Sequence, residues 1–199
     1  MKFGCIILAA GAGTRFGGNK LAASVNGHPI IEYIFDSLPA RLFHRVVVVS
    51  ANPSVIKTAQ SHSFELAYND RPELGVSRSI RMGLELMEDT DACMFCVADQ
   101  PLLRRETLAG MLDAYESESI LMISHKGQSG NPVIYPSGLY GELNSLSGEE
   151  SGKTVACRHD DLLRLYHLAE GYQLIDIDTK EDLKAVEACL SISPDSDNS

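Results

Sequence analysis

The sequence predicts an α/β fold in which helices cover a doubly wound sheet, and three observations support this. Short apolar runs alternate with segments of helical periodicity along the 199 residues. Several runs are apolar at consecutive positions, as are strands buried on both faces of a parallel sheet. The connections are short, which is typical of alternating strands and helices. We expect one domain over residues 1–190 and a disordered polar tail at 191–199.

Six apolar runs are the expected strands. They lie at residues 5–10, 46–49, 93–98, 120–123, 133–135 and 174–177. Within the third run, Cys93 and Cys96 have the C-x-x-C spacing of some metal sites. Residues three apart on a strand point to opposite faces, so we interpret both as core cysteines.

Four segments have the apolar spacing of amphipathic helices. Residues 30–38 follow Pro29, a residue that favours the first helical turn. Residues 76–87 and 108–115 carry apolar side chains three or four positions apart. The fourth segment follows Thr179, a candidate N-cap, and extends to residue 190. Acidic residues occupy its first turn, where they are favourable.

Composition excludes several classes of function. Seventeen basic and 27 acidic residues give a net charge of −10, which disfavours nucleic acid and anionic membranes as partners. No apolar run approaches the roughly 20 residues of a membrane span. The five cysteines are odd in number and lie mostly in apolar runs, as expected of reduced thiols. We therefore predict a cytoplasmic protein that binds neither nucleic acid nor membrane.

The most informative segment is LAAGAGTRFGGNK, residues 8–20, directly after the first expected strand. Its glycines allow backbone N–H groups to approach an anion, while Arg15 and Lys20 supply positive charge. A Walker loop would need a lysine directly after Gly18, but Asn19 intervenes. A dinucleotide fingerprint would need glycine in place of Phe16. The segment thus fits neither of these two phosphate-binding schemes.

Residues 8–20 do resemble the L-A-A-G-x-G/S-x-R-x-G-x-x-K motif of nucleotidyltransferases with a glycosyltransferase-A-like fold. The resemblance implies a single three-layer α/β/α domain with a mixed, mostly parallel, Rossmann-like sheet. It also implies that this segment wraps the triphosphate of a bound NTP, with Arg15 and Lys20 on the phosphates.

Four further segments narrow the resemblance. They are Asp99-Gln100-Pro101, the G-x-S-x-S-x-R-x-G-L pattern at 75–84, GNPV at 130–133 and DIDTKED at 176–182. Together they resemble the molybdenum cofactor cytidylyltransferases and close MobA-like NTP transferases. Residues 146–153 match the G-D-x-G-A-R motif of that branch only approximately, since they include an additional residue. Lys180 stands where the branch commonly has proline.

The resemblance implies a role for individual residues. Catalysis is assigned to Arg15, Lys20 and Asp99. Nucleotide contacts are assigned to Leu8, Ala9, Ala10, Gly11, Gly13, Arg15, Lys20, Gly75, Ser79 and Asp99. Acceptor contacts are assigned to Ser77, Arg81, Gln100, Gly130, Asn131 and Pro132, although Arg78 and Arg81 also fit solvated helix charges. Mg²⁺ is assigned to Asp99 and Asp178, with Asp176 as a competing ligand.

The implied reaction is Mg²⁺-dependent transfer of CMP from CTP to the terminal phosphate of molybdopterin, with release of pyrophosphate. Guanylyl-transferring relatives read L-A-G-G at the first turn, so Ala10 favours CTP over GTP. A molybdoenzyme of the hydroxylase class is the implied protein partner. Two alternatives stay open: a cytidylyltransferase for another phosphorylated small molecule, and a non-catalytic carrier of nucleotide or pterin cofactor.

Overall fold

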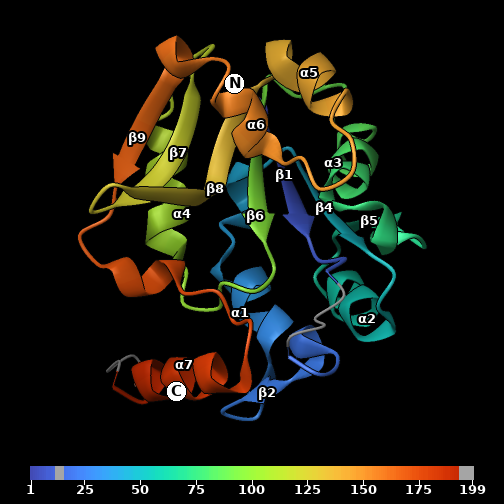
Figure 1. Ribbon diagram of the computed structural model, residues 1–199, viewed down its shortest axis with the longest axis vertical. Helices are drawn as coiled ribbons and strands as arrows, with labels where there is room; N and C mark the ends of the chain where they lie inside the picture. The colour runs from blue at the N-terminus through green and yellow to red at the C-terminus, as the bar shows by residue number, and fades with distance from the viewer. Residues whose placement is uncertain (12–15, 193–199) are drawn as a thin grey trace.

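The computed structural model describes residues 1–11 and 16–192 of the chain. Most of the expected tail, residues 193–199, lies outside the described residues, while residues 191 and 192 end the last helix. Within the described residues, the main sheet has seven strands in the order β5-β4-β1-β6-β8-β7-β9 (Figure 1). In chain order these are β1 (Phe3–Leu8), β4 (Arg45–Ser50), β5 (Glu65–Tyr68), β6 (Ala92–Val97), β7 (Ile120–His125), β8 (Gln128–Pro136) and β9 (Leu163–His167).

The sheet is mixed and mostly parallel, as expected. Strands β5, β4, β1 and β6 run parallel to one another, and β9 runs parallel to β7. Strand β8 is antiparallel to both of its neighbours. The short strands β2 (Ser24–Val25) and β3 (His28–Pro29) pair separately.

Helices cover both faces of the sheet and complete three layers (Figure 1). One face is covered by α1 (Ile30–Ser37), α2 (Pro53–Ser61) and α4 (Arg105–Asp113). The other is covered by α3 (Val76–Leu84), α5 (Tyr140–Asn144) and α6 (Gly152–Ala156). The last helix, α7 (Lys180–Ile192), packs beside β2. Single 3-10 turns occupy Lys20–Ala22, Ala40–Leu42, Pro72–Leu74, Ser137–Leu139, Asp160–Leu162 and Gly171–Leu174.

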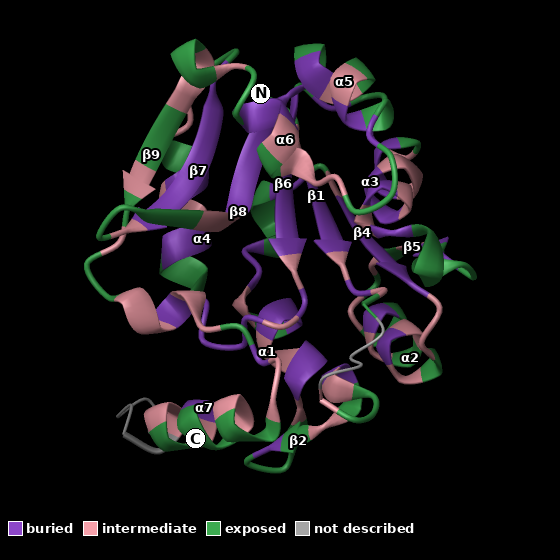
Figure 2. Cartoon of the chain, viewed as in Figure 1, coloured by how far each residue is buried: buried purple, intermediate pink, exposed green. Residues whose placement is uncertain are grey.

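The central strands are buried on both faces (Figure 2). Within β1, Cys5 and Ile7 join the core on one side of the sheet, and Ile6 joins the core on the other. Cys93 and Cys96 of β6 likewise lie in opposite cores. The interpretation of these two cysteines as core residues is therefore confirmed.

Five of the six expected strands form, and the expectation for residues 174–177 is wrong. Gly171–Leu174 is a 3-10 turn, and the following residues are not in a strand. The sheet position beside β7 is filled by β9, and the segment instead crosses toward the carboxyl end of β6. There the Ile177 N–H donates to the Asp99 carbonyl at 2.9 Å, and the Ile177 side chain is fully buried. The apolar run thus reflects burial in the core and not pairing in the sheet.

The four expected helices all form, with ends shifted by a few residues. The predicted cap of α7 is confirmed in detail: Asp182 N–H donates to Thr179 Oγ1 at 3.2 Å, and Thr179 N–H donates to Asp182 Oδ2 at 2.7 Å. This reciprocal pair is a capping box. Among the helices of residues 1–11 and 16–192, none has the length and apolarity to cross a membrane.

Candidate active site

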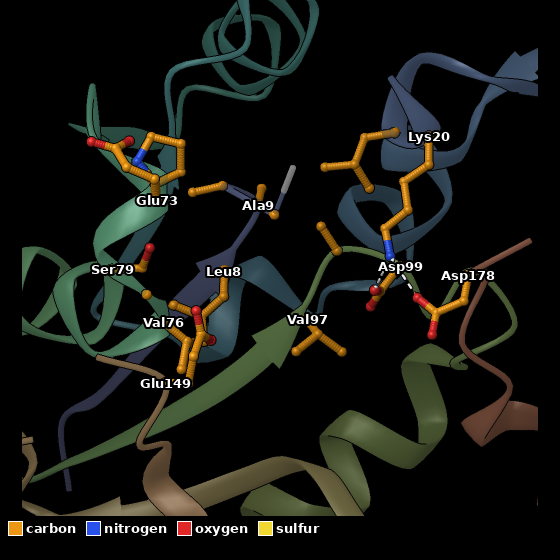
Figure 3. A pocket seen from close by; sticks show the side chains of 16 residues that line it. Leu8, Ala9, Lys20, Glu73, Val76, Ser79, Val97, Asp99, Glu149 and Asp178 are labelled. Atoms are coloured by element: carbon orange, nitrogen blue, oxygen red, sulfur yellow. Dashed lines mark hydrogen bonds and ion pairs between the residues drawn. The ribbon is translucent and has the colours of Figure 1, made fainter. Parts of the chain in front are cut away.

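A cavity of about 490 Å³ opens where β1 and β6 end. The two strands are parallel and adjacent, so the residues that follow each of them meet at the same edge of the sheet. The cavity is lined by Leu8, Ala9, Ala10, Gly11, Lys20, Leu21, Pro72, Glu73, Gly75, Val76, Ser79, Val97, Ala98, Asp99, Glu149 and Asp178. Figure 3 shows Glu73, Ser79 and Glu149 at one end and Lys20, Asp99 and Asp178 at the other.

The cavity gathers most of the residues expected to contact a nucleotide. Segment 8–11, Lys20, Gly75, Ser79 and Asp99 all line it. Two expected contacts, Gly13 and Arg15, lie outside the described residues.

Lys20 joins the two acids expected to hold a metal ion. Its Nζ lies 2.6 Å from Asp99 Oδ2 and 3.2 Å from Asp178 Oδ1 (Figure 3). Partial burial acts to lower the pKa of Lys20, but the contacts with Asp99 and then Asp178 outweigh it and raise the pKa. Lys20 is therefore a permanent positive charge at this end of the cavity.

The two carboxylates also fit a divalent cation. Asp99 Oδ1 is buried and has no hydrogen-bond partner among the described residues, which leaves a hard oxygen ligand available. Asp178 is fixed from the other side, because its N–H donates to Asp182 Oδ2 at 3.0 Å. Within the described residues no group of three or more His, Cys, Asp or Glu side chains could hold a metal ion. Mg²⁺ commonly binds proteins through one or two carboxylates together with phosphate oxygens and water.

Asp176 has a different partner from Asp178. Gln100 Nε2 donates to Asp176 Oδ1 at 2.9 Å, whereas Lys20 forms its ion pair with Asp178. Burial raises the pKa of Asp176, and the nearby charge of Asp99 adds to the effect. The two competing acids therefore lie in different surroundings, Asp178 beside Lys20 and Asp176 beside Gln100.

A second cavity, of about 420 Å³, adjoins the first and shares Val97, Asp99 and Asp178 with it. Three of the expected acceptor contacts, Gln100, Gly130 and Asn131, line this second cavity. Pro132 follows Asn131 through a cis peptide bond and is buried without lining the cavity.

The structure does not bring Ser77 and Arg81 to the acceptor cavity. Ser77 is fully buried and its N–H donates to the Gly148 carbonyl at 3.2 Å. Arg81 Nη1 donates to the Leu146 carbonyl at 3.0 Å. Both residues of α3 therefore hold the 146–148 segment, whereas Ser79 of the same helix faces the first cavity.

Gly75 explains why this segment lies so close to α3. Gly75 has a φ of 90°, and a Cβ there would overlap the backbone of Gly148. The close approach brings Glu149 to the cavity wall.

Sequence reasoning missed Glu149, which lines the cavity, and Asn69, which contacts the lining residue Ser79. Glu149 lies in the segment 146–153 that matches the family motif only approximately, and its acidic character was the available signal. Asn69 is fully buried, donates to Ser79 Oγ at 2.9 Å and accepts from Arg78 Nε at 2.9 Å. A single asparagine after a short strand gives no sequence signal for such a role.

The chain is similar in sequence to known nucleotidyltransferases. Residues 5–162 match the family described as MobA-like NTP transferase domain. The bifunctional protein GlmU of Clostridioides difficile is 28% identical over 138 residues, which are 68% of this chain and 30% of that protein. The molybdenum cofactor guanylyltransferase of Vibrio cholerae is 28% identical over 132 residues, 65% of this chain and 62% of that protein. The chain thus spans less than two thirds of either relative.

Three solved structures share the fold. A nucleotidyl transferase from Methanothermobacter superposes with a TM-score of 0.82 at 17% identity, over 96% of this chain and 98% of that one. Rv0371C of Mycobacterium tuberculosis in complex with manganese gives 0.75 at 16% identity, over 94% and 99%. A CMP:2-keto-3-deoxy-manno-octonic acid synthetase complexed with CTP gives 0.71 at 14% identity, over 96% and 99%.

Proposed function

Because the chain belongs to the MobA-like NTP transferase domain family, we propose that it is a nucleotidyltransferase that transfers CMP from CTP to the terminal phosphate of a molybdopterin-type acceptor. Pyrophosphate is the second product. One observation carries the proposal: segment 8–11, Lys20 and the acids Asp99 and Asp178 line a single cavity beside a second cavity that also contains Asp99 and Asp178.

In this proposal the two substrates lie on opposite sides of the acidic pair, one in each cavity. The nucleotide occupies the larger cavity, with its triphosphate on the backbone of segment 8–11 and on Lys20. The acceptor occupies the cavity of Gln100, Gly130 and Asn131. The shared wall then holds the acceptor phosphate next to the α-phosphorus of the nucleotide.

The proposed reaction is an in-line displacement. An oxygen of the acceptor phosphate attacks the α-phosphorus, a new P–O bond forms, and the bond from the α-phosphorus to the bridging oxygen of pyrophosphate breaks. The nucleophile is already ionised near neutral pH, so no general base is needed. Lys20 stabilises the charge that develops on the leaving pyrophosphate.

Asp99 and Asp178 are the residues that would hold a divalent metal ion, for which we propose Mg²⁺. A bound divalent ion supplies charge neutralisation for the triphosphate. Asp99 Oδ1, buried and without a partner among the described residues, supports this assignment.

CTP is the proposed nucleotide because Ala10 lines the cavity where the guanylyl-transferring relatives have glycine. A methyl group discriminates between ligands by about 1–3 kcal/mol, enough for a measurable preference. Because the chain is 28% identical to a guanylyltransferase, GTP is the nucleotide whose activity should be compared with that of CTP.

The test is pyrophosphate release from CTP and molybdopterin by the wild type and by Asp99→Asn and Lys20→Ala. We expect a fall of about 10²-fold or more in each variant, since Asp99→Asn weakens the proposed metal site and Lys20→Ala removes the positive charge that stabilises the leaving pyrophosphate. Asp113→Asn and Lys57→Ala change the same residue types at exposed positions on α4 and α2 and should leave the rate unchanged. Full turnover in both site variants would overturn the mechanism.

The same assay separates the alternatives. Faster release with GTP or ATP than with CTP would correct the nucleotide. Release with a sugar or polyol phosphate, and none with molybdopterin, would identify another acceptor. Tight binding of nucleotide without repeated turnover would indicate a carrier.

A further inference from the structure

We propose that Lys20 occupies the place of the divalent cation until a nucleotide arrives, so that metal binds tightly only together with the triphosphate. The inference rests on the proposed nucleotidyltransferase site and adds the order in which that site is filled. It concerns the side chain of Lys20 and its two partners.

The ammonium already contacts both of the carboxylates that would hold a metal ion. Lys20 Nζ contacts Asp99 Oδ2 and Asp178 Oδ1 at once, at 2.6 and 3.2 Å. A cation between these carboxylates would lie within a few ångströms of Nζ, where two positive charges repel strongly. Metal entry therefore requires Lys20 to leave.

Burial makes this competition effective. The side chain of Lys20 is 11% exposed and that of Asp99 is 22% exposed. Water screens the attraction between two such partly buried charges much less than it screens a pair on the surface. The ammonium of Lys20 therefore competes effectively with a metal ion for the carboxylates.

The ammonium is nevertheless an incomplete substitute for a metal. It binds Asp99 through Oδ2 and leaves Oδ1 buried without a partner among the described residues. A buried acceptor without a partner is unfavourable, so the arrangement favours replacement by a cation that can reach this oxygen as well.

A bound triphosphate would favour movement of the Lys20 side chain away from the two carboxylates. Lys20 and the backbone of segment 8–11 line the same cavity, so a triphosphate there would offer Lys20 new anionic partners. As Lys20 turns to the phosphates, it no longer competes with a metal ion for the two carboxylates. Nucleotide and metal therefore raise each other's affinity, as linkage requires.

The test measures binding of Mn²⁺ in the absence of nucleotide, using the electron paramagnetic resonance signal of the free ion. Lys20→Met removes the ammonium, and we expect it to bind Mn²⁺ at least about tenfold more tightly than the wild type. Lys57→Met removes an exposed lysine of α2 and should bind like the wild type. Equal affinity of Lys20→Met and the wild type would overturn the proposal.

A second measurement uses the wild-type protein, so it does not depend on the folding of a variant. Mn²⁺ at saturating concentration should release Lys20 from its acids and increase its reductive methylation, read by mass spectrometry, while Lys57 stays unchanged. Unaltered methylation of Lys20 would contradict the proposal. Neither measurement involves turnover, so a protein that releases no pyrophosphate could still meet both expectations.

Discussion

Gly83 shows how the absence of one side chain controls the packing of α3 on the sheet. A Cβ at this position would lie 2.7 Å from Cγ2 of Ile6, which is fully buried in β1. Gly83→Ala gains up to ~1 kcal/mol in helix propensity but overpacks the core, which typically costs about 1–3 kcal/mol. We expect a net loss on the order of 1 kcal/mol in the free energy of unfolding, measured with urea.

Gly141 of α5 provides the matched control. A Cβ there meets nothing within 4 Å, so Gly141→Ala should keep or slightly raise the free energy of unfolding. Equal free energies of unfolding for the two alanine variants would show that the contact with Ile6 does not destabilise Gly83→Ala.

At the scale of residues, the sequence predicts which residues gather at the site better than it predicts which of their side chains are in contact. A glycine within a helical pattern indicates close packing, and Gly83 does lie closely against Ile6. Lys20 and Asp99 were expected in one site, but their direct ion pair depends on how far each side chain reaches in the folded chain. No motif describes such a distance.

At the scale of elements, the strands that can be predicted from the sequence are those that are buried on both faces. Strands β1, β4 and β6 lie inside the sheet and are apolar on both faces, so consecutive apolar residues predict them. The edge strands β5 and β9 are short and partly exposed, and their mixed composition gave no prediction. Residues 174–177 show the opposite error, because an apolar run can be buried without pairing in a sheet.

The capping box of α7 is the element-scale feature closest to the site. Asp182 Oδ2 accepts hydrogen bonds from Asp178 N–H and Thr179 N–H, so it both begins the helix and fixes the backbone of Asp178. Asp182→Ala should lower the free energy of unfolding by about 1 kcal/mol, as loss of a helix cap does. Displacement of Asp178 should also slow pyrophosphate release, by up to about 10²-fold.

Denaturant unfolding and the pyrophosphate assay check both effects. Glu181→Ala, which removes an exposed acid from the same turn, separates capping from the general benefit of negative charge there. Equal losses in the two variants would argue against a specific role of the capping box.

At the scale of the whole molecule, the candidate site depends on segments that are distant in sequence. Its walls come from residues 8–11, the turn at Lys20, the start of α3, the end of β6 and the segment before α7. The sheet brings them together, and it is held between two hydrophobic cores on its opposite faces. The geometry of the site is therefore a property of the complete fold.

The buried thiols allow the cooperativity of this fold to be measured. Cys5, Cys93 and Cys96 are fully buried in the two central strands, with Cys5 and Cys96 in one core and Cys93 in the other. Burial raises the pKa of both Cys5 and Cys93, which suppresses the reactive thiolate. Cys157 is exposed. We expect a thiol reagent to label Cys157 first and the three buried cysteines roughly 10³-fold or more slowly, because they react only after global unfolding.

Mass spectrometry of Cys5, Cys93, Cys96 and Cys157 under native conditions gives their four rates, and a Cys157→Ser variant removes the reaction of the exposed thiol as a control. If the sheet unfolds as one unit, Cys5, Cys93 and Cys96 should share one rate, and that rate should rise with urea in step with global unfolding. Faster labelling of Cys93 than of Cys5 would show that the core under α3 opens independently. In that case the wall of the cavity formed by α3 would be less rigidly held than the acidic pair opposite it, because only the α3 side of the sheet would open.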